Sequence, residues 1–198
     1  MEPVPRATFY FDLGSPYAYL TAERIAEVIA ESVDWQPISL GALFKQTGRS
    51  SWGLGDAAGR RAGMAEVQRR ALAYGLPQVR WPDPWPGNYL MAMRAAIFAQ
   101  RAGHVHDFTI RAFRNAFQAG HDLSIPARVL EAARDAGLDP AEVEAATRAD
   151  EIKLALRDAT DVAGRLGVFG VPTIAIDGEL FWGDDRLKDA AAHLQSAA

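Results

Sequence analysis

The segment Ser15-Pro16-Tyr17 is the part of this chain whose residue types could do chemistry. Serine is favoured just before a helix and proline at its first position, so the segment predicts a helix start capped by Ser15. The free N–H groups of such a start, with roughly half a positive charge, attract anions. The Ser15 hydroxyl could therefore donate a hydrogen bond to the sulfur of a ligand held there as a thiolate. The alternative is a plain capping serine that contributes about 1 kcal/mol to stability.

Cysteine is absent from all 198 residues of the chain. This absence excludes a disulfide framework, a thiolate metal cage and a protein-borne dithiol, so thiol chemistry at Ser15 needs an external thiol. His104 and His106 suggest a metal site at first sight. They are two residues apart on an expected helix and point to different faces, so we expect no metal.

Hydrophobic patterning predicts the elements that must position these residues. Aromatic and β-branched runs predict strands, and apolar residues at helical spacing predict helices. The expected strands are 7–13, 33–40, 168–176 and 179–182, the last two joined by a turn at Asp177-Gly178. The expected helices are 17–29, 64–74, 89–102, 105–119, 125–136, 140–166 and 186–194. We expect 48–63 to be a loop or an irregular helix start, and the proline-rich segment 81–87 to be irregular.

These elements follow the order β-α-β, then helices, then β-β-α. The order predicts an α/β protein with a thioredoxin-like fold and a large all-helical insertion. We expect residues 1–42 and 166–198 to form a discontinuous thioredoxin-like domain, and residues 43–165 to form the inserted helical domain.

The composition is that of a globular protein, with 49% hydrophobic residues and a net charge of -4. No basic stripe could neutralise phosphates, so nucleic acid is not an expected partner. The first residues lack the pattern of a signal peptide, and no apolar run approaches the roughly 20 residues that cross a bilayer. We therefore expect a cytoplasmic protein that does not bind a membrane.

Several segments together resemble one known family. The opening 9–20, the turn 170–173 and the closing segment 181–187 are similar to the opening, the Val-Pro turn and the Gly-x-Asp-Arg signature of the 2-hydroxychromene-2-carboxylate isomerases. These enzymes are close relatives of the kappa-class glutathione transferases. Further similar segments lie between these three, in the same order: 40–45, 86–88 with Ala92 and Arg94, and 122–124.

The resemblance implies a thioredoxin fold with a helical insertion, glutathione as cofactor, a small aromatic substrate and a homodimer. The implied reaction is a cis–trans isomerisation between a 2-hydroxychromene-2-carboxylate and an open-chain hydroxybenzylidenepyruvate, a step in aromatic breakdown. Addition of a thiolate turns a conjugated double bond into a single bond that can rotate, and its expulsion restores the double bond as the other isomer. Ser15 is the implied catalytic residue.

The resemblance also implies where glutathione binds. Its sulfur would lie at Ser15 and Pro16, and a cis bond between Val171 and Pro172 would turn the Val171 backbone toward Ser15 to pair with the cysteinyl backbone. A proline that merely starts an edge strand is the alternative.

Gly183-Asp184-Asp185 opens the last predicted helix. Its N–H groups could bind the γ-glutamyl carboxylate, and Asp185 could pair with the ammonium group. Alternatively, Asp184 caps the helix and Asp185 compensates its dipole.

The chain departs from the family at three places. Arg49 stands where asparagine is common, Arg60 or Arg61 where lysine is usual, and Gly63 where tyrosine is usual. Arg49 is a candidate contact for the glycyl carboxylate of glutathione, or a sign of a different substrate.

Five residues are candidate contacts for a flat aromatic substrate: Tyr17, Phe44, Trp85, Asn88 and Phe169. The alternative for the aromatics is core and loop anchoring, and for Asn88 a helix cap. A kappa-like transferase acting on another electrophile, or a non-catalytic thiol-binding protein, would have the same thiol site.

Overall fold

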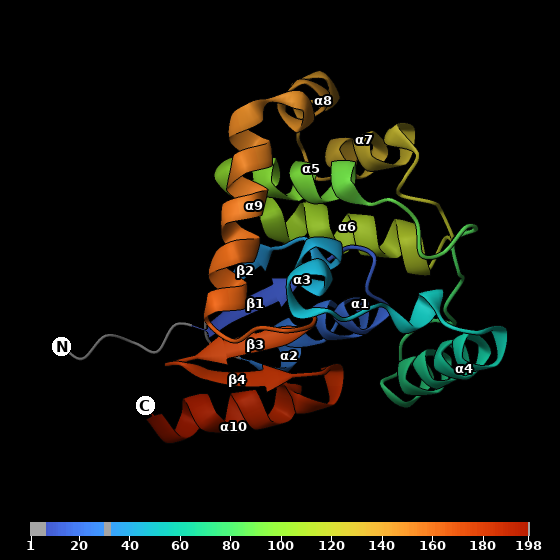
Figure 1. Ribbon diagram of the computed structural model, residues 1–198, viewed down its shortest axis with the longest axis vertical. Helices are drawn as coiled ribbons and strands as arrows, with labels where there is room; N and C mark the ends of the chain where they lie inside the picture. The colour runs from blue at the N-terminus through green and yellow to red at the C-terminus, as the bar shows by residue number, and fades with distance from the viewer. Residues whose placement is uncertain (1–6, 30–32, 198) are drawn as a thin grey trace.

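The computed structural model describes residues 7–29 and 33–197, and its strands form one sheet in the order β2-β1-β3-β4 (Figure 1). Strand β1 (Ala7–Phe11) pairs in parallel with β2 (Val33–Pro37) and antiparallel with β3 (Thr173–Ile176). Strand β4 (Glu179–Trp182) pairs antiparallel with β3. A β-α-β half and a β-β-α half therefore share one sheet, which confirms the predicted thioredoxin-like α/β fold.

Helices account for most of the remaining chain. They are α1 (Pro16–Ala22), α2 (Ile25–Val28), α3 (Leu40–Thr47), α4 (Ala57–Ala73), α5 (Leu90–Arg101), α6 (Val105–Phe117), α7 (Pro126–Asp135), α8 (Pro140–Arg148), α9 (Asp150–Arg165) and α10 (Leu187–Ala197). Two single 3-10 turns, Trp52–Leu54 and Asp184–Arg186, precede α4 and α10.

Two of the predicted helices are interrupted in the structure. The first ends at Ala22 and restarts at Ile25; between the two parts, the Arg24 side chain donates to the carbonyl of Asp184 at 3.2 Å. The helix expected over 140–166 breaks at Ala149, whose backbone is extended. Asp150 and Glu151 then begin α9, where acidic side chains favour a helix start.

The structure corrects three further boundaries. Strand β2 ends at Pro37, and the unpredicted helix α3 follows, capped by Ser39 through a 3.3 Å hydrogen bond from Ala42 N. Helix α4 starts at Ala57, capped by Asp56, so the end of the expected loop 48–63 is helical. Strand β3 begins only at Thr173, because residues 168–172 form the turn that leads into it.

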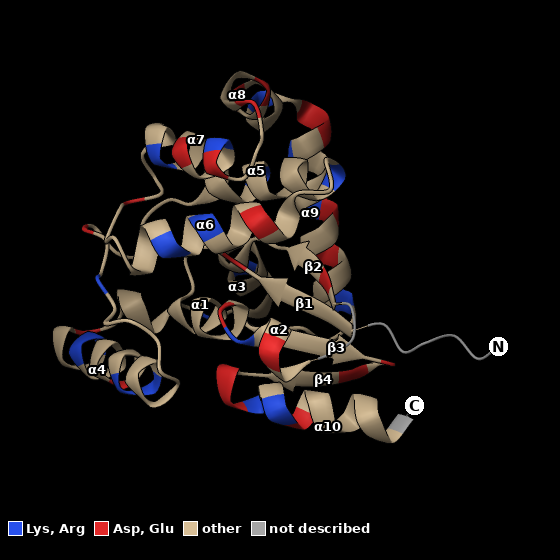
Figure 2. Ribbon diagram, turned by 180° about the vertical axis from the view of Figure 1, so that it is seen from behind, with Lys and Arg blue, Asp and Glu red and all other residues tan. Residues whose placement is uncertain are grey.

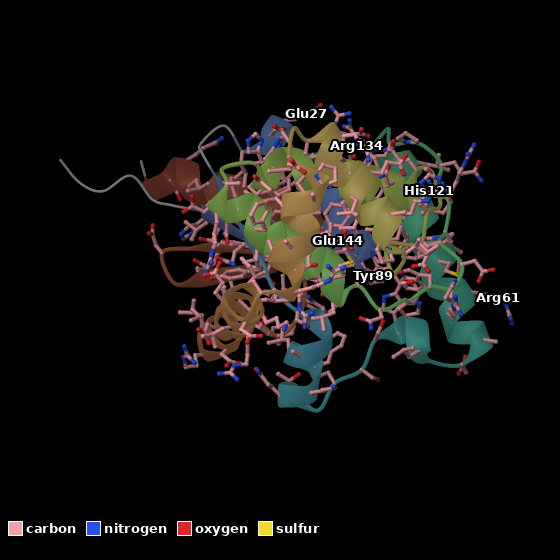
Figure 3. All side chains as sticks on the ribbon, turned by 90° about the horizontal axis from the view of Figure 1, so that it is seen from above. Glu27, Arg61, Tyr89, His121, Arg134 and Glu144 are labelled. Atoms are coloured by element: carbon pink, nitrogen blue, oxygen red, sulfur yellow. The ribbon has the colours of Figure 1, made fainter. Side chains whose placement is uncertain are left out.

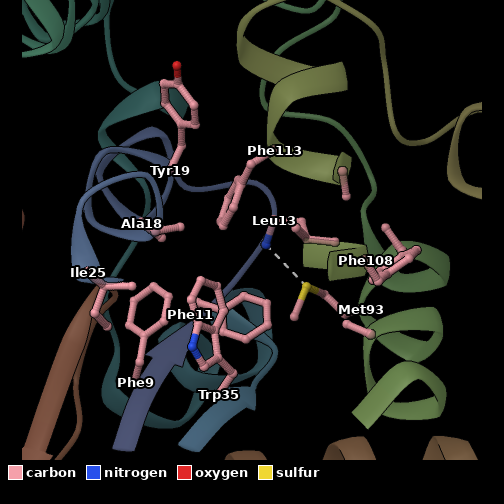
Figure 4. Close-up of a cluster of buried hydrophobic side chains, with 14 of the residues drawn as sticks. Phe9, Phe11, Leu13, Ala18, Tyr19, Ile25, Trp35, Met93, Phe108 and Phe113 are labelled. Carbon is pink, nitrogen blue, oxygen red and sulfur yellow. Dashed lines mark hydrogen bonds between the residues drawn. The ribbon is translucent and has the colours of Figure 1, made fainter. Parts of the chain in front are cut away.

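Strand β1 is buried on both faces of the sheet. Phe9 and Phe11 pack on one face against Trp35, with ring centroids 4.9 and 5.9 Å away (Figure 4). Tyr10 packs on the other face among Ile38 and the side chains of Leu43, Ala163, Val168 and Val171. The chain that leaves β1 toward Ser15 therefore starts from a fixed, fully buried position.

The helical segment packs closely on the sheet. Helices α5, α6, α7 and α8 lie on one side of it, and α10 lies beyond β4 on the other (Figure 1). The main core runs without a break from β1 to residues of α5, α6 and α7, and the Leu13 N–H contacts the Met93 sulfur at 3.2 Å (Figure 4). The predicted division into domains at 42/43 and 165/166 stays a prediction.

Charged residues of both signs occur along α6, α7 and α10 (Figure 2). Among residues 7–29 and 33–197, no helix is long and apolar enough to cross a membrane. Within the same ranges, no cluster of three or more His, Asp or Glu side chains could hold a metal ion.

Candidate active site at the start of helix α1

Ser15 lies where helix α1 begins, as the sequence predicts. Its backbone is extended, Pro16 occupies the first helical position, and its Oγ accepts a hydrogen bond from Ala18 N at 3.2 Å. The same hydroxyl donates to the carbonyl of Val171 at 3.4 Å. Ser15 is 5% exposed. The hydroxyl is thus held between a helix N-terminus and a loop that is 156 residues away in the chain.

The turn before β3 completes this arrangement. The bond between Val171 and Pro172 is cis, as expected from the family resemblance. The Val171 carbonyl accepts a hydrogen bond from the Ser15 hydroxyl. The N–H of Val171 makes no hydrogen bond within residues 7–29 and 33–197. A free N–H beside Ser15 can pair with the backbone of a peptide-like ligand, as an added strand would.

A cavity of about 570 Å³ opens next to this start of α1. Its lining includes polar groups of Asp12, Gly14 and Asn88 and the apolar side chains of Phe44, Leu54, Leu90 and Met93. Arg49 and Lys45 also line it. A cavity of this size, apolar with a few polar groups and two cations, suits a flat, negatively charged organic molecule.

Of the five predicted substrate contacts, two line this cavity and three do not. Phe44 and Asn88 line the cavity, and the Asn88 side chain also caps the Leu90 N–H at 3.2 Å. Tyr17 and Phe169 lie outside it: Tyr17 contacts Trp52, and Phe169 contacts Trp182, with the two rings tilted and their centroids 4.8 Å apart.

Trp85 is buried, not a cavity wall. It is 3% exposed and its indole N–H donates to the carbonyl of Gly14 at 3.1 Å. This position does not support the substrate contact predicted for Trp85, and it agrees with the alternative of loop anchoring.

Arg49 lies at the edge of the cavity. Its guanidinium is 4.4 Å from the centroid of the Phe169 ring, in a cation–π contact. The structure therefore brings together two predicted residues, one from each half of the fold. Arg49 is exposed, so its charge is accessible to a carboxylate.

The two acidic residues before α10 differ in their surroundings. Asp184 is 1% exposed, and its carboxylate accepts from Arg70 Nη1 at 2.7 Å and from the Tyr74 hydroxyl at 2.8 Å. Burial raises the pKa of Asp184, although Tyr74 and Arg70 act to lower it. The side chain of Asp185 is 61% exposed and lies 3.7 Å from Arg70. Of the pair predicted to bind glutathione, only Asp185 has a carboxylate open to a ligand.

The departure at Gly63 has a steric explanation. A Cβ built on Gly63 would lie 2.4 Å from the ring of Trp52, so a side chain fits there only if that ring moves. Trp52 places its own aromatic ring 6.2 Å from that of Tyr17. Arg60 donates to the carbonyl of Trp85, whereas Arg61 projects from α4 at the edge of the molecule (Figure 3).

Two residues at the site are missing from the sequence predictions. Asp12 is buried, and its carboxylate accepts from Gly14 N and Leu40 N, both at 2.8 Å. Burial raises the pKa of Asp12, while the two N–H donors act to lower it. An aspartate two residues before a glycine turn is a signal for such a bond. Tyr89 lines the cavity, lies well inside the outline of the molecule (Figure 3) and gives no comparable signal.

Replacing Tyr89 by phenylalanine is expected to reduce the loss of stability at high pH. Burial raises the pKa of Tyr89 to about 12; the Gly87 backbone acts to lower it, and the carboxylates of Asp122 and Asp12 act to raise it. An unfolded tyrosine ionises near pH 10, so below that pH both states are protonated. Between about pH 10 and 12 the unfolded state loses its proton first, and the free energy of unfolding falls by about 2 kcal/mol.

Urea unfolding at pH 9 and pH 11.5 checks this. The decline between the two pH values should be smaller in Tyr89→Phe than in the wild type. The same decline in both proteins would contradict the assignment. At pH 9 the variant should be about as stable as the wild type, because the tyrosine is protonated in both the folded and the unfolded state at that pH.

Comparison with known proteins identifies similar sequences and structures. The family model for the DSBA-like thioredoxin domain matches residues 7–195. A 2-hydroxychromene-2-carboxylate isomerase from Sphingobium xenophagum is 24% identical over 192 residues, which cover 94% of this chain and 96% of that protein. One from Pseudomonas putida is 28% identical over 189 residues, covering 90% and 89%.

A solved structure of a 2-hydroxychromene-2-carboxylate isomerase has a TM-score of 0.79 with this chain. The sequence identity to it is 23%, and the match covers 97% of this chain and 95% of that one. At this identity the structural similarity shows the fold.

Proposed function

This chain belongs to the DSBA-like thioredoxin domain family, and we propose that it is a glutathione-dependent cis–trans isomerase of 2-hydroxychromene-2-carboxylate or a closely similar substrate. The observation that carries the proposal is the Ser15 hydroxyl, held at the N-terminus of α1 and 3.4 Å from the Val171 carbonyl in a chain without cysteine. A serine there cannot exchange disulfides, but it can bind the sulfur of an external thiol.

The residues around Ser15 fit glutathione. Its thiol matches the hydroxyl and the helix N-terminus, and its central peptide backbone matches the free Val171 N–H. The exposed carboxylate of Asp185 suits its ammonium group, and the exposed guanidinium of Arg49 suits its glycyl carboxylate. These donors and acceptors come from both halves of the fold.

When bound, glutathione would supply the sulfur nucleophile for reversible addition to a conjugated double bond. Ser15 and the N-terminus of α1 favour negative charge at this position, which lowers the pKa of a thiol bound there. The cavity beside Gly14 would hold the substrate, with Phe44 against its ring and the cation of Lys45 available to its carboxylate. The names of the relatives support this substrate class.

A kappa-like transferase is the second candidate. It is favoured by Arg49 and by Gly63, beside which Trp52 lies; these are two of the three places where this chain departs from the family it resembles. Both candidates need the same thiol site and differ in what occupies the cavity. The homodimer and the cytoplasmic location stay predictions.

Calorimetry with glutathione tests the shared part of the proposal. We expect saturable binding below millimolar ligand, and no binding at millimolar ligand would contradict both candidates. Ultraviolet assays then separate them. Glutathione-dependent interconversion of the chromene carboxylate supports the isomerase, whereas activity only with a standard electrophile supports the transferase.

A further inference from the structure

All three backbone groups of Gly14, the residue before Ser15, contact side chains. Its N–H donates to Asp12 Oδ1 at 2.8 Å, and its carbonyl accepts from Trp85 Nε1 at 3.1 Å. Its Cα faces the ring of Tyr89, because a Cβ built on Gly14 would lie 2.5 Å from Tyr89 Cδ2. No residue other than glycine fits here unless the Tyr89 ring moves.

These contacts determine the orientation of the Ser15 side chain. The Gly14 carbonyl and the Ser15 N–H belong to one peptide group, and the Ser15 N–H donates to the Asp12 carbonyl at 3.0 Å. Fixing that peptide group fixes the orientation from which the Ser15 side chain departs. The contact from Ser15 Oγ to Val171 is already long at 3.4 Å, so a small rotation of the backbone would break it.

Trp85 is itself firmly held, although its loop has no regular structure. Its ring lies 4.7 Å from that of Trp81 and 4.8 Å from that of Trp52. Its carbonyl accepts from Arg60 on α4. Trp85 is 71 residues from Gly14 in the chain, and Tyr89 is adjacent to α5. The segment 81–89 thus connects the helical part of the protein to the start of α1.

We infer that Trp85 and Tyr89 are positioning residues for Ser15, acting through the carbonyl and the Cα of Gly14. The expected effect on catalysis rests on the proposed function. The expected effect on the orientation of Ser15 does not. Trp85 acts through a hydrogen bond and Tyr89 through the bulk of its ring.

The matched variants Trp85→Phe and Trp81→Phe test the hydrogen bond. Both remove one indole from the same aromatic cluster, but the Trp81 indole makes no hydrogen bond within the described residues. In the unliganded protein, we expect Trp85→Phe to shift the amide NMR signals of Gly14, Ser15 and Ala18 and to speed their hydrogen exchange. Trp81→Phe should leave these signals in place. Equal changes in both variants, or none in Trp85→Phe, would overturn the inference.

Catalysis gives the second measurement. Loss of one hydrogen bond should lower kcat about five- to tenfold in Trp85→Phe, with a smaller change in KM for glutathione. The pKa of bound glutathione, followed by thiolate absorbance, should rise in Trp85→Phe and stay unchanged in Trp81→Phe. If the wild type binds no glutathione, the proposed function fails, and the amide signals alone decide the inference.

Tyr89 provides a test that does not depend on Trp85→Phe folding. Tyr89→Phe keeps the ring against Gly14 and should retain the wild-type amide signals. Tyr89→Leu loses the ring and should shift those of Gly14 and Ser15. Identical spectra for these two variants would overturn the role assigned to the ring.

Discussion

Replacing Ser15 by alanine is expected to lower kcat/KM at least about a hundredfold, while the free energy of unfolding falls by only about 1 kcal/mol. The two effects differ because the hydroxyl has two roles. As a cap it satisfies one backbone donor, Ala18 N, and the loss of such a cap costs about 1 kcal/mol. As a donor to a sulfur anion, with its single proton turned from the Val171 carbonyl to the sulfur, it acts in a buried position, where a lost hydrogen bond to charge is costly.

The matched control is another helix cap that lies away from the site. Asp139 caps α8 by accepting from Ala141 N at 2.7 Å. Asp139→Ala should lose a similar amount of stability in urea unfolding and keep wild-type turnover of the chromene carboxylate. If Ser15→Ala loses no more activity than Asp139→Ala, Ser15 is only a cap and the proposed mechanism is wrong.

Features fixed by neighbouring residues could be predicted from the sequence. The Ser15 cap, the helix start at Pro16 and the turn at Asp177-Gly178 each depend on residues within a few positions. Helix α3 had comparable signals, Ser39 as cap and Gly48 with φ 70 at its end, yet it was not predicted. With eight residues it is too short to show a clear helical periodicity, and in the sequence the alternation of the preceding strand continues to Leu40.

Features that depend on distant residues could not be predicted. The bond from Trp85 to Gly14 joins residues 71 apart, and that from Arg70 to Asp184 joins residues 114 apart. A single sequence does not show which cation meets which carboxylate. For this reason the sequence does not show that Asp184 is buried in an ion pair while Asp185 is exposed.

Replacing Asp184 by alanine is expected to lower the free energy of unfolding by about 3 kcal/mol. The change removes the buried acceptor for Arg70 and Tyr74, which hold α4 against the start of α10. Removing one member of a buried pair costs about 3–5 kcal/mol, because the other is left without its partner. We expect the low end of that range, since Arg70 also contacts Glu66 at 2.7 Å. The fall in melting temperature should be about 6–12 °C.

Asp185→Ala is the matched control, and it should show the opposite pattern. The Asp185 side chain is exposed and 3.7 Å from Arg70, so its ion pair contributes less than about 1 kcal/mol to stability. Its proposed role is to bind the ammonium group of glutathione, so Asp185→Ala should weaken glutathione binding in calorimetry with little change in melting temperature. Asp184→Ala, in contrast, should mainly lower the melting temperature. If both variants melt alike, the carboxylate of Asp184 does not stabilise the contact between α4 and α10, and its burial has another cause.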